Sequence, residues 1–258
     1  MICSALVDWL DAADFPLGDA SALGRPLAAY PLMAAKSSAR VHRSFALSSV
    51  QSVKSAALQY GAVILDPPPK QEQSAPSRLL RFAAEAVSHE VAKEGERLEL
   101  LIVLSAQAPA VTGALIDSGV EAVMEKPGFD SALSASRLPS WTAQADLQEA
   151  PDGAFELRTG RDARGEANRN SEIWNPNWSL FVLKPELINS AQPRPLGWLG
   201  KKIFAVKQRG IWPVEHPWQI PALESWLKQH GVSDAAYAPE PQPQAQKSVK
   251  PMPSRPLL

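Results

Sequence analysis

Short continuous apolar runs divide the first half of the chain. The clearest is LELLIVLSA at 98–106, and similar runs are MICSALV at 1–7, AVILD at 62–66 and VEAVMEKPG at 120–128. A run in which successive residues are all apolar is typical of a strand that is buried on both faces, because side chains alternate between the two faces of a sheet. The pattern therefore predicts a strand at each of these places.

Between these runs the apolar residues recur every three or four positions. This spacing predicts helices over 50–60, 77–93 and 109–118, and we take Gly61 and Gly119 as the stops of the first and third. Strands that alternate with helices favour an α/β fold with a doubly wound parallel sheet and right-handed crossovers.

The second half of the chain has a different character. Strands are expected near both ends of 154–183, and a helix over 220–230, with Pro221 in its first turn and Gly231 after its last. We therefore predict three parts: an α/β domain at 1–140, a smaller tryptophan-rich, basic α+β domain at 141–238, and a disordered proline-rich tail at 239–258.

The composition excludes several classes of protein. The 258 residues are 45% hydrophobic with a net charge of −1, which is ordinary for a globular protein. A single cysteine leaves no disulfide framework and no cysteine cluster for zinc, and the four histidines are scattered. We read neither a membrane span nor a secretory signal in the sequence, so the expected location is the cytoplasm.

Three chemically useful side chains follow three predicted strands. Asp66 ends AVILD, Ser105 lies in LELLIVLSA, and Lys126 with Pro127 follows the run at 120–128. Ligands collect at the carboxyl ends of parallel strands, so we expect these groups to meet on one rim. The set, over residues 40–136, resembles the receiver domain of two-component response regulators.

The resemblance implies a phosphoryl switch. Asp66 would accept the phosphoryl group, Ser105 and Lys126 would contact its oxygens, and Mg²⁺ would bind Asp8, Asp11 and Asp66. The spacings around Asp66 are longer than usual and its flanking sequence is PPPK, which favours a divergent or pseudo-receiver. Such a protein would be a regulatory or scaffolding module that binds a protein partner. An unrelated α/β sheet with polar strand ends would leave the same pattern.

The string DPPPK at 66–70 supports another interpretation. It is similar to the DPPY-type element of amino-methyltransferases, which use S-adenosylmethionine. Pro69 stands where that family has an aromatic residue, and the glycine-rich cofactor loop is absent. A degenerate or active methyltransferase associated with nucleic acid is therefore the alternative function.

The second half also carries basic residues among tryptophans. Two segments, 158–169 and 194–209, could meet phosphates while Trp174, Trp178 and Trp198 stack on bases. The alternative is that the tryptophans fill the core of a small domain. The candidates for nucleic-acid contact are Arg158, Arg161, Arg164, Lys201, Lys202, Lys207 and Arg209.

Overall fold

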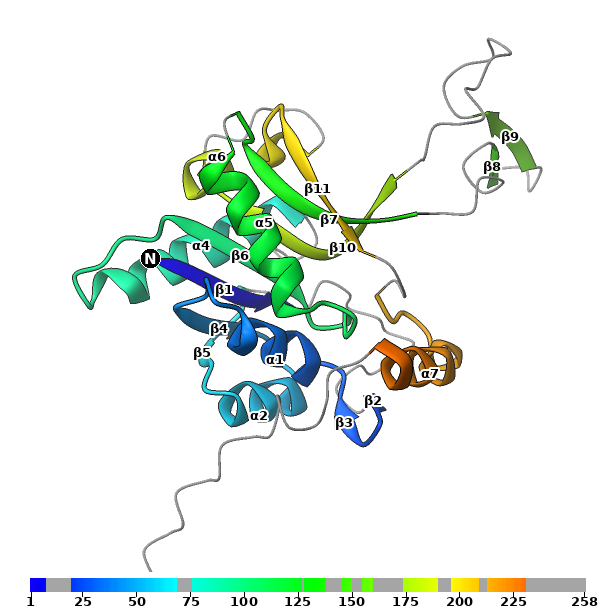
Figure 1. The fold of residues 1–258 in the computed structure, drawn as a ribbon, viewed down its shortest axis with the longest axis horizontal. Helices are drawn as coiled ribbons and strands as arrows, with labels where there is room; N and C mark the ends of the chain where they lie inside the picture. The colour runs from blue at the N-terminus through cyan, green and yellow to red at the C-terminus, as the bar shows by residue number, and fades with distance from the viewer. Residues whose placement is uncertain are drawn as a thin grey trace, which may run out of the picture.

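A computed structural model of the chain gives the fold (Figure 1). It describes residues 1–7, 20–68, 76–126, 128–137, 145–149, 155–159, 174–189, 196–208 and 213–230.

Within the described residues, seven strands form one sheet in the order β11-β7-β10-β6-β1-β4-β5. Every neighbouring pair is parallel except the two that β10 makes. The α/β class with a largely parallel sheet is therefore confirmed. The strands are β1 (Ile2–Val7), β4 (Arg43–Leu47), β5 (Val63–Leu65), β6 (Leu100–Ser105), β7 (Ser131–Arg137), β10 (Trp174–Leu183) and β11 (Ile203–Gln208).

The sheet uses strands from both sides of residue 140. β10 and β11 pair with β7, so the boundary expected near residue 140 does not separate two sheets. Two hairpins stand outside this sheet: β2 (Ser21–Ala22) pairs with β3 (Arg25–Pro26), and β8 (Ala145–Glu149) pairs with β9 (Phe155–Thr159). The expected tail at 239–258 lies outside the described residues.

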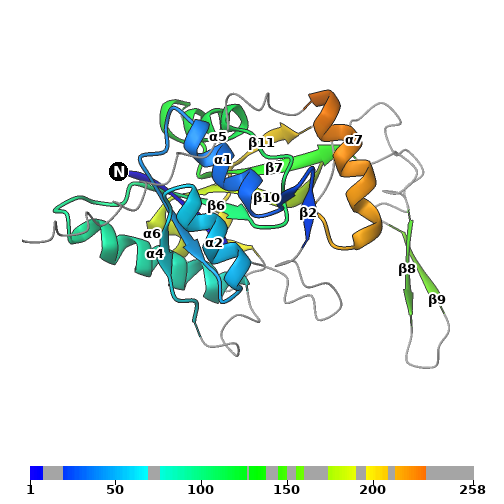
Figure 2. The same cartoon turned by 90° about the horizontal axis from the view of Figure 1, so that it is seen from below.

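Helices cover both faces of the sheet (Figure 2). One apolar cluster joins the sheet to α1 (Ala29–Ser37), α2 (Gln51–Gln59), α5 (Gly113–Glu125) and α7 (Ile220–His230). The opposite face packs against α4 (Pro76–Ala92), α6 (Pro185–Asn189) and the short 3₁₀ turn η2 (Gly197–Leu199). The helices predicted over 50–60, 77–93 and 220–230 are confirmed to within a residue. None of the helices described here is long and apolar enough to cross a membrane.

The strand predicted over 120–128 is wrong. Residues 120–125 form the second half of α5, which runs through Gly119 without ending there. The glycine lets the helix approach the sheet, because a Cβ at this position would lie 2.9 Å from Val182 Cγ2 and 3.3 Å from Val206 Cγ2. Gly119 is therefore a packing residue and not a helix stop.

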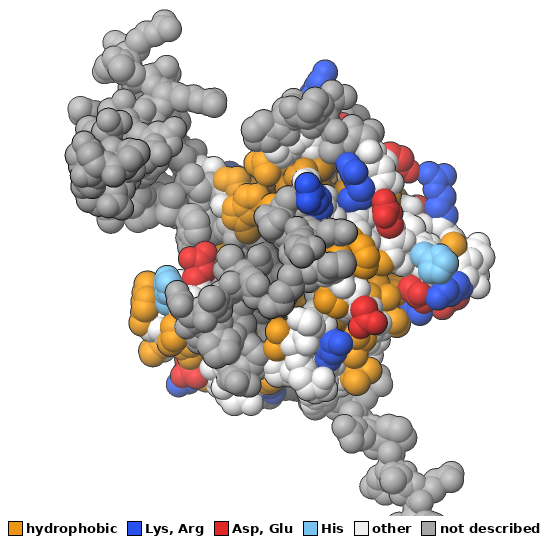
Figure 3. Space-filling view, turned by 180° about the vertical axis from the view of Figure 1, so that it is seen from behind, with side chains coloured by type: hydrophobic (Ala, Val, Ile, Leu, Met, Phe, Trp, Pro, Cys, Tyr) orange, Lys and Arg blue, Asp and Glu red, His pale blue; other side chains and the backbone are white. Residues whose placement is uncertain are grey.

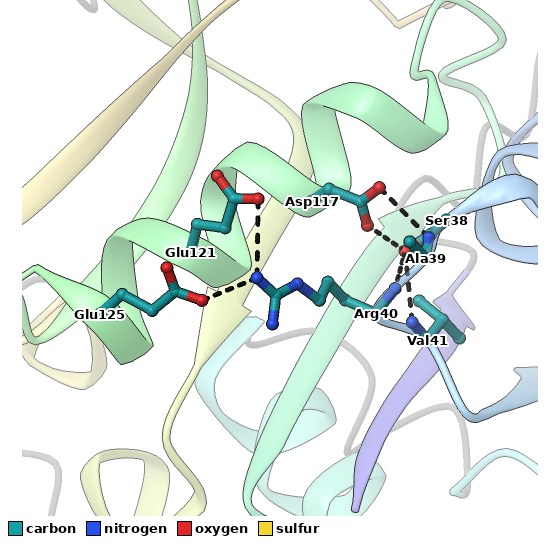
Figure 4. A network of polar contacts seen from close by, with 7 residues as sticks. All are labelled: Ser38, Ala39, Arg40, Val41, Asp117, Glu121 and Glu125. Carbon is teal, nitrogen blue, oxygen red and sulfur yellow. Dashed lines mark hydrogen bonds and ion pairs between the residues drawn. The ribbon is translucent and has the colours of Figure 1, made fainter.

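Polar contacts fix α5 to the connection between α1 and β4 (Figure 4). The Asp117 carboxylate accepts hydrogen bonds from the Ser38 hydroxyl and, at 3.1 Å, from the Ala39 amide. One turn and two turns further along the helix, Glu121 and Glu125 pair with Arg40 at 3.7 and 2.7 Å. The Arg40 pairs are exposed and contribute little, whereas Asp117 accepts hydrogen bonds from two groups of the turn at Ser38.

Candidate functional site

The strand order identifies where a ligand would bind. From β1 the chain proceeds outward to β4 and β5, and then returns to the other side of β1 as β6. When the connections that follow two neighbouring parallel strands run to opposite sides of the sheet, a crevice opens at the carboxyl ends of these strands. Open α/β sheets bind their ligands there. Val7 and Ser105 are paired residues at those two ends, so this rule places the expected crevice beside them.

Neutral polar side chains line the end of β6. Ser105 is 2% exposed, and its hydroxyl donates to Oε1 of Gln107 at 2.8 Å. The Gln107 carbonyl in turn accepts the Val214 amide at 2.8 Å. This last bond brings the segment before α7 to the same rim.

A second group of polar side chains is buried at the ends of β7, β10 and β11. The hydroxyl of Ser134 donates to Oδ1 of Asn177, while Nδ2 of Asn177 donates to Ser136 Oγ at 2.7 Å and to Gln208 Oε1 at 2.9 Å. All four side chains are at most 2% exposed. Nε2 of Gln208 is buried without a hydrogen-bond partner, which costs free energy.

The register of β10 shifts at this group. Between Pro176 and Phe181 the strand bulges, and Trp178 takes a φ of 58°, a left-handed value that is uncommon for a bulky residue. The indole of Trp178 is 37% exposed and meets Phe181 edge to face. Nearby on the rim, Lys207 Nζ lies 4.8 Å from the ring centre of Trp174.

The three residues expected to share one rim do not meet. Asp66 follows β5 at one side of the sheet, where its carboxylate is 95% exposed and lies 3.7 Å from Lys54 Nζ. Ser105 ends the central strand β6. Lys126 caps the carboxyl end of α5 and lies over Phe204 of β11, near the amino ends of β7 and β11. Asp66 and Lys126 are thus at opposite sides and opposite ends of the sheet.

The expected magnesium ligands cannot be assembled from the residues described here. Asp8 and Asp11 lie outside the described residues, and Asp66 is paired with Lys54. Among the residues that are described, no group of three or more histidine, cysteine or acidic side chains could hold a metal ion.

The basic candidates are dispersed. Lys201 and Lys202 precede β11 at the amino end of the strand, whereas Lys207 lies at its carboxyl end. The amides of Lys202 and Lys201 donate to the Asp130 carboxylate at 2.9 and 2.6 Å, and these bonds lower the pKa of Asp130. Arg161, Arg164 and Arg209, and the side chain of Arg158, lie outside the described residues.

Charge is mixed on the surface seen from behind (Figure 3). Basic and acidic side chains are interspersed there, with hydrophobic side chains exposed between them. Proteins that bind nucleic acid usually present a surface on which basic residues are clustered, without interspersed acidic ones. Binding of nucleic acid through 158–169 and 194–209, like binding of a protein partner, stays a prediction.

The sequence interpretation missed the residues that build this rim. Gln107, Asn177 and Gln208 were not singled out, nor was the hairpin at 21–26 that follows the segment leaving β1. Gln107 could have been identified from the sequence, because it directly follows the most strongly predicted strand, at 98–106. The buried asparagine could not be found in this way, because its partners come from three strands far apart in the sequence.

Comparison with known proteins identifies the fold. No protein-family description matches the sequence, and no curated protein sequence matches it. Among solved structures, a CMP:2-keto-3-deoxy-manno-octonic acid synthetase complexed with CTP is similar with a TM-score of 0.64 and 11% identity, covering 88% of this chain and 98% of that one. A 4-diphosphocytidyl-2C-methyl-D-erythritol synthase from Anaerococcus prevotii is similar with a TM-score of 0.61 and 10% identity, covering 88% and 96%.

These matches overturn the receiver interpretation. The chain shares the fold of these two enzymes, and the likeness extends over nearly the whole chain, well beyond residues 40–136. The regulatory or scaffolding function that the resemblance implied is therefore wrong. The switch roles of Asp66, Ser105 and Lys126 rested on that resemblance, and the structure does not bring the three residues together. The methyltransferase alternative is not supported either, since both of the similar structures are enzymes of another kind.

Proposed function

We propose that the chain is a nucleotidyltransferase that uses CTP and transfers its CMP unit to a small acceptor at the carboxyl rim. The observation that carries the proposal is the fold match over 88% of this chain with two enzymes, one complexed with CTP and the other named for a diphosphocytidyl product. The sequence identity is low, so the proposal depends on the shared architecture and on the residues of the rim.

The reaction needs little covalent chemistry from the protein. An oxygen of the acceptor attacks the α-phosphorus of CTP, the bond from that phosphorus to the bridging oxygen breaks, and pyrophosphate leaves with the electron pair. If the acceptor oxygen is a hydroxyl, its proton passes to solvent or to a base. The work of the protein is to hold both molecules in line and to stabilise the charge on the phosphate oxygens.

Arg25 is our candidate for a phosphate contact. It belongs to β3 in the hairpin that follows β1 in the chain. This hairpin packs against α1 and against α7, and the segment before α7 is bonded to the residues that follow β6. The residue is half-buried, with Nη1 3.7 Å from Met33 Sδ of α1. A guanidinium held against a helix keeps its planar donors in a fixed direction, as recognition of a phosphate requires.

Neutral side chains would form the base of the ligand site. Ser105 and Gln107 stand at the switch point, and Asn177 and Gln208 stand further along the same rim, all at most 2% exposed. Their hydrogen bonds to one another would hold the backbone of the rim in place beneath the ligands. They add no negative charge that would repel a triphosphate.

Mg²⁺ usually accompanies a nucleoside triphosphate and neutralises its charge. The described residues do not by themselves fit such an ion, because carboxylates are not gathered on the part of the rim that the structure describes. We therefore assign no ligand to it.

Two measurements test the proposal. Isothermal titration with CTP, UTP, ATP and GTP should show saturable binding with CTP preferred, and pyrophosphate release from CTP should depend on an added sugar acid or polyol phosphate. Arg25→Ala should weaken CTP binding by about tenfold, the value of one charged hydrogen bond. Arg81→Ala, an exposed arginine on α4, is the control. A folded wild-type protein that binds none of the four nucleotides contradicts the proposal.

A further inference from the structure

The hairpin that carries Arg25 has an unfavourable turn. β2 and β3 are joined by Leu23 and Gly24, whose φ values are 48° and 74°. Positive φ at both positions is the mark of a type I′ turn, which favours asparagine, aspartate or glycine at the first position. Leucine there is strained, because its Cβ crowds the backbone in the left-handed region.

A residue from the other end of the chain supports this turn. The amide of Leu23 donates to Oε1 of Glu224 at 2.8 Å, although the two residues are 201 positions apart. In a two-residue hairpin the amide of the first loop residue faces away from the ladder, so no strand partner accepts it. Glu224 supplies that acceptor and holds the strained residue in place.

The helix that carries Glu224 packs against the apolar core. α7 lies beside the hairpin in both ribbon views (Figures 1 and 2), and Leu223 and Leu227 are 0% and 7% exposed in the same apolar cluster as Ala22 and Leu27. The bond from the Val214 amide to the Gln107 carbonyl ties the segment before α7 to the end of β6. Glu224 therefore links the hairpin to the rim where the nucleotide is proposed to bind.

From this geometry we propose that Glu224 is a positioning residue, which fixes the turn at Leu23 and so holds Arg25 ready for the nucleotide. The inference rests on the proposed function. It adds a role for the last helix: α7 closes the apolar core and also prepares the binding hairpin before any ligand arrives.

Hydrogen exchange and CTP titration of the full chain test this role. Glu224→Ala should speed amide exchange at Leu23 and Gly24 in the unliganded protein and should weaken CTP binding by about tenfold. Glu224→Gln keeps an acceptor oxygen and should stay near wild type in both measurements. Gln229→Ala removes another long polar side chain from the exposed surface of α7 and should change neither.

Rescue at the turn separates positioning from general stability. Asparagine adopts the left-handed conformation more easily than leucine, so Leu23→Asn combined with Glu224→Ala should recover most of the lost affinity. If Glu224→Ala binds CTP as wild type does, or leaves exchange at Leu23 unchanged, the inference is overturned while the proposed function stands. A folded wild type that binds no nucleotide overturns both.

Discussion

Asn177 of β10 and Gln208 of β11 are joined by a hydrogen bond of 2.9 Å from Nδ2 to Oε1, although β7 lies between their strands. The bond passes alongside Ser134 and Ser136, which contact the same asparagine. Three strands are thus tied together at the carboxyl rim by one buried amide. Oδ1 of Asn177 also accepts the Ser179 amide at 3.2 Å, within the bulge that contains Trp178.

Removal of this amide should destabilise the protein markedly. Asn177→Ala leaves the polar groups of Ser136 and Gln208 buried without their partner, and we expect the free energy of unfolding to fall by about 2–4 kcal/mol. Urea denaturation followed by circular dichroism measures the change. Asn189→Ala, at an exposed position in α6, should stay within about 0.5 kcal/mol of wild type. Equal effects of the two substitutions would refute the role of the network.

Close packing of α5 makes Gly119 intolerant of a side chain. In Gly119→Ala the new methyl group would meet Val182 at 2.9 Å, and we expect a loss of about 1–3 kcal/mol by thermal or chemical denaturation. Gly→Ala in a helix with free space would instead stabilise it. The double variant Gly119→Ala, Val182→Ala should cost less than the sum of the single changes, and strict additivity would contradict the contact.

The Asp117 contacts with Ser38 and Ala39 should matter more than the exposed ion pairs of Arg40. Asp117→Ala removes the acceptor of two hydrogen bonds at the start of the connection to β4, with an expected cost of about 1–2 kcal/mol. Arg40→Ala removes exposed pairs with Glu121 and Glu125 and should cost at most about 0.5–1 kcal/mol. Chemical denaturation of the two variants side by side compares them, and the reverse order of effects would be inconsistent with Figure 4.

Cys3 should be unreactive in the folded protein. It is 0% exposed in β1, which lies between β6 and β4, and burial raises the pKa of its thiol to about 11. Because the folded thiol holds its proton more tightly than the unfolded one, its contribution to stability is complete below the ordinary pKa of 9.0 and is lost as the pH rises toward 11. A thiol reagent at pH 8 should label the protein only after denaturant is added. Cys3→Ala should flatten the alkaline part of the stability profile, and rapid labelling of the native protein would contradict this burial.

The sequence alone predicted helices and strands correctly where the local pattern of residues decides the structure. The run at 98–106 is the central strand β6, and α7 has the bounds expected from Pro221 and Gly231. The pattern failed at Gly119. This glycine lies inside a helix because Val182 leaves no room for a side chain there. It also could not show that β10 would enter the sheet antiparallel between β6 and β7, because that pairing depends on contacts between distant segments.

The candidate site was less accessible to prediction than the fold. The grouping of Asp66 with Lys126 assumed that 120–128 is a strand; as a helix, it carries Lys126 to the other end of the sheet. The residues that do meet at the rim are neutral, and a buried Asn177 has the same appearance in a sequence as a solvated one. Only the topology, with its switch point between β1 and β6, locates the crevice.

The amide-exchange footprint of CTP tests the central claim most directly. If the nucleotide binds at the crevice, CTP should slow exchange in the peptides that cover Ala20–Leu27 and Ser105–Val111, and should leave Gly128–Asp130 at the opposite end of the sheet unchanged. Protection confined to that opposite end, or no protection in any peptide at saturating CTP, would contradict the account.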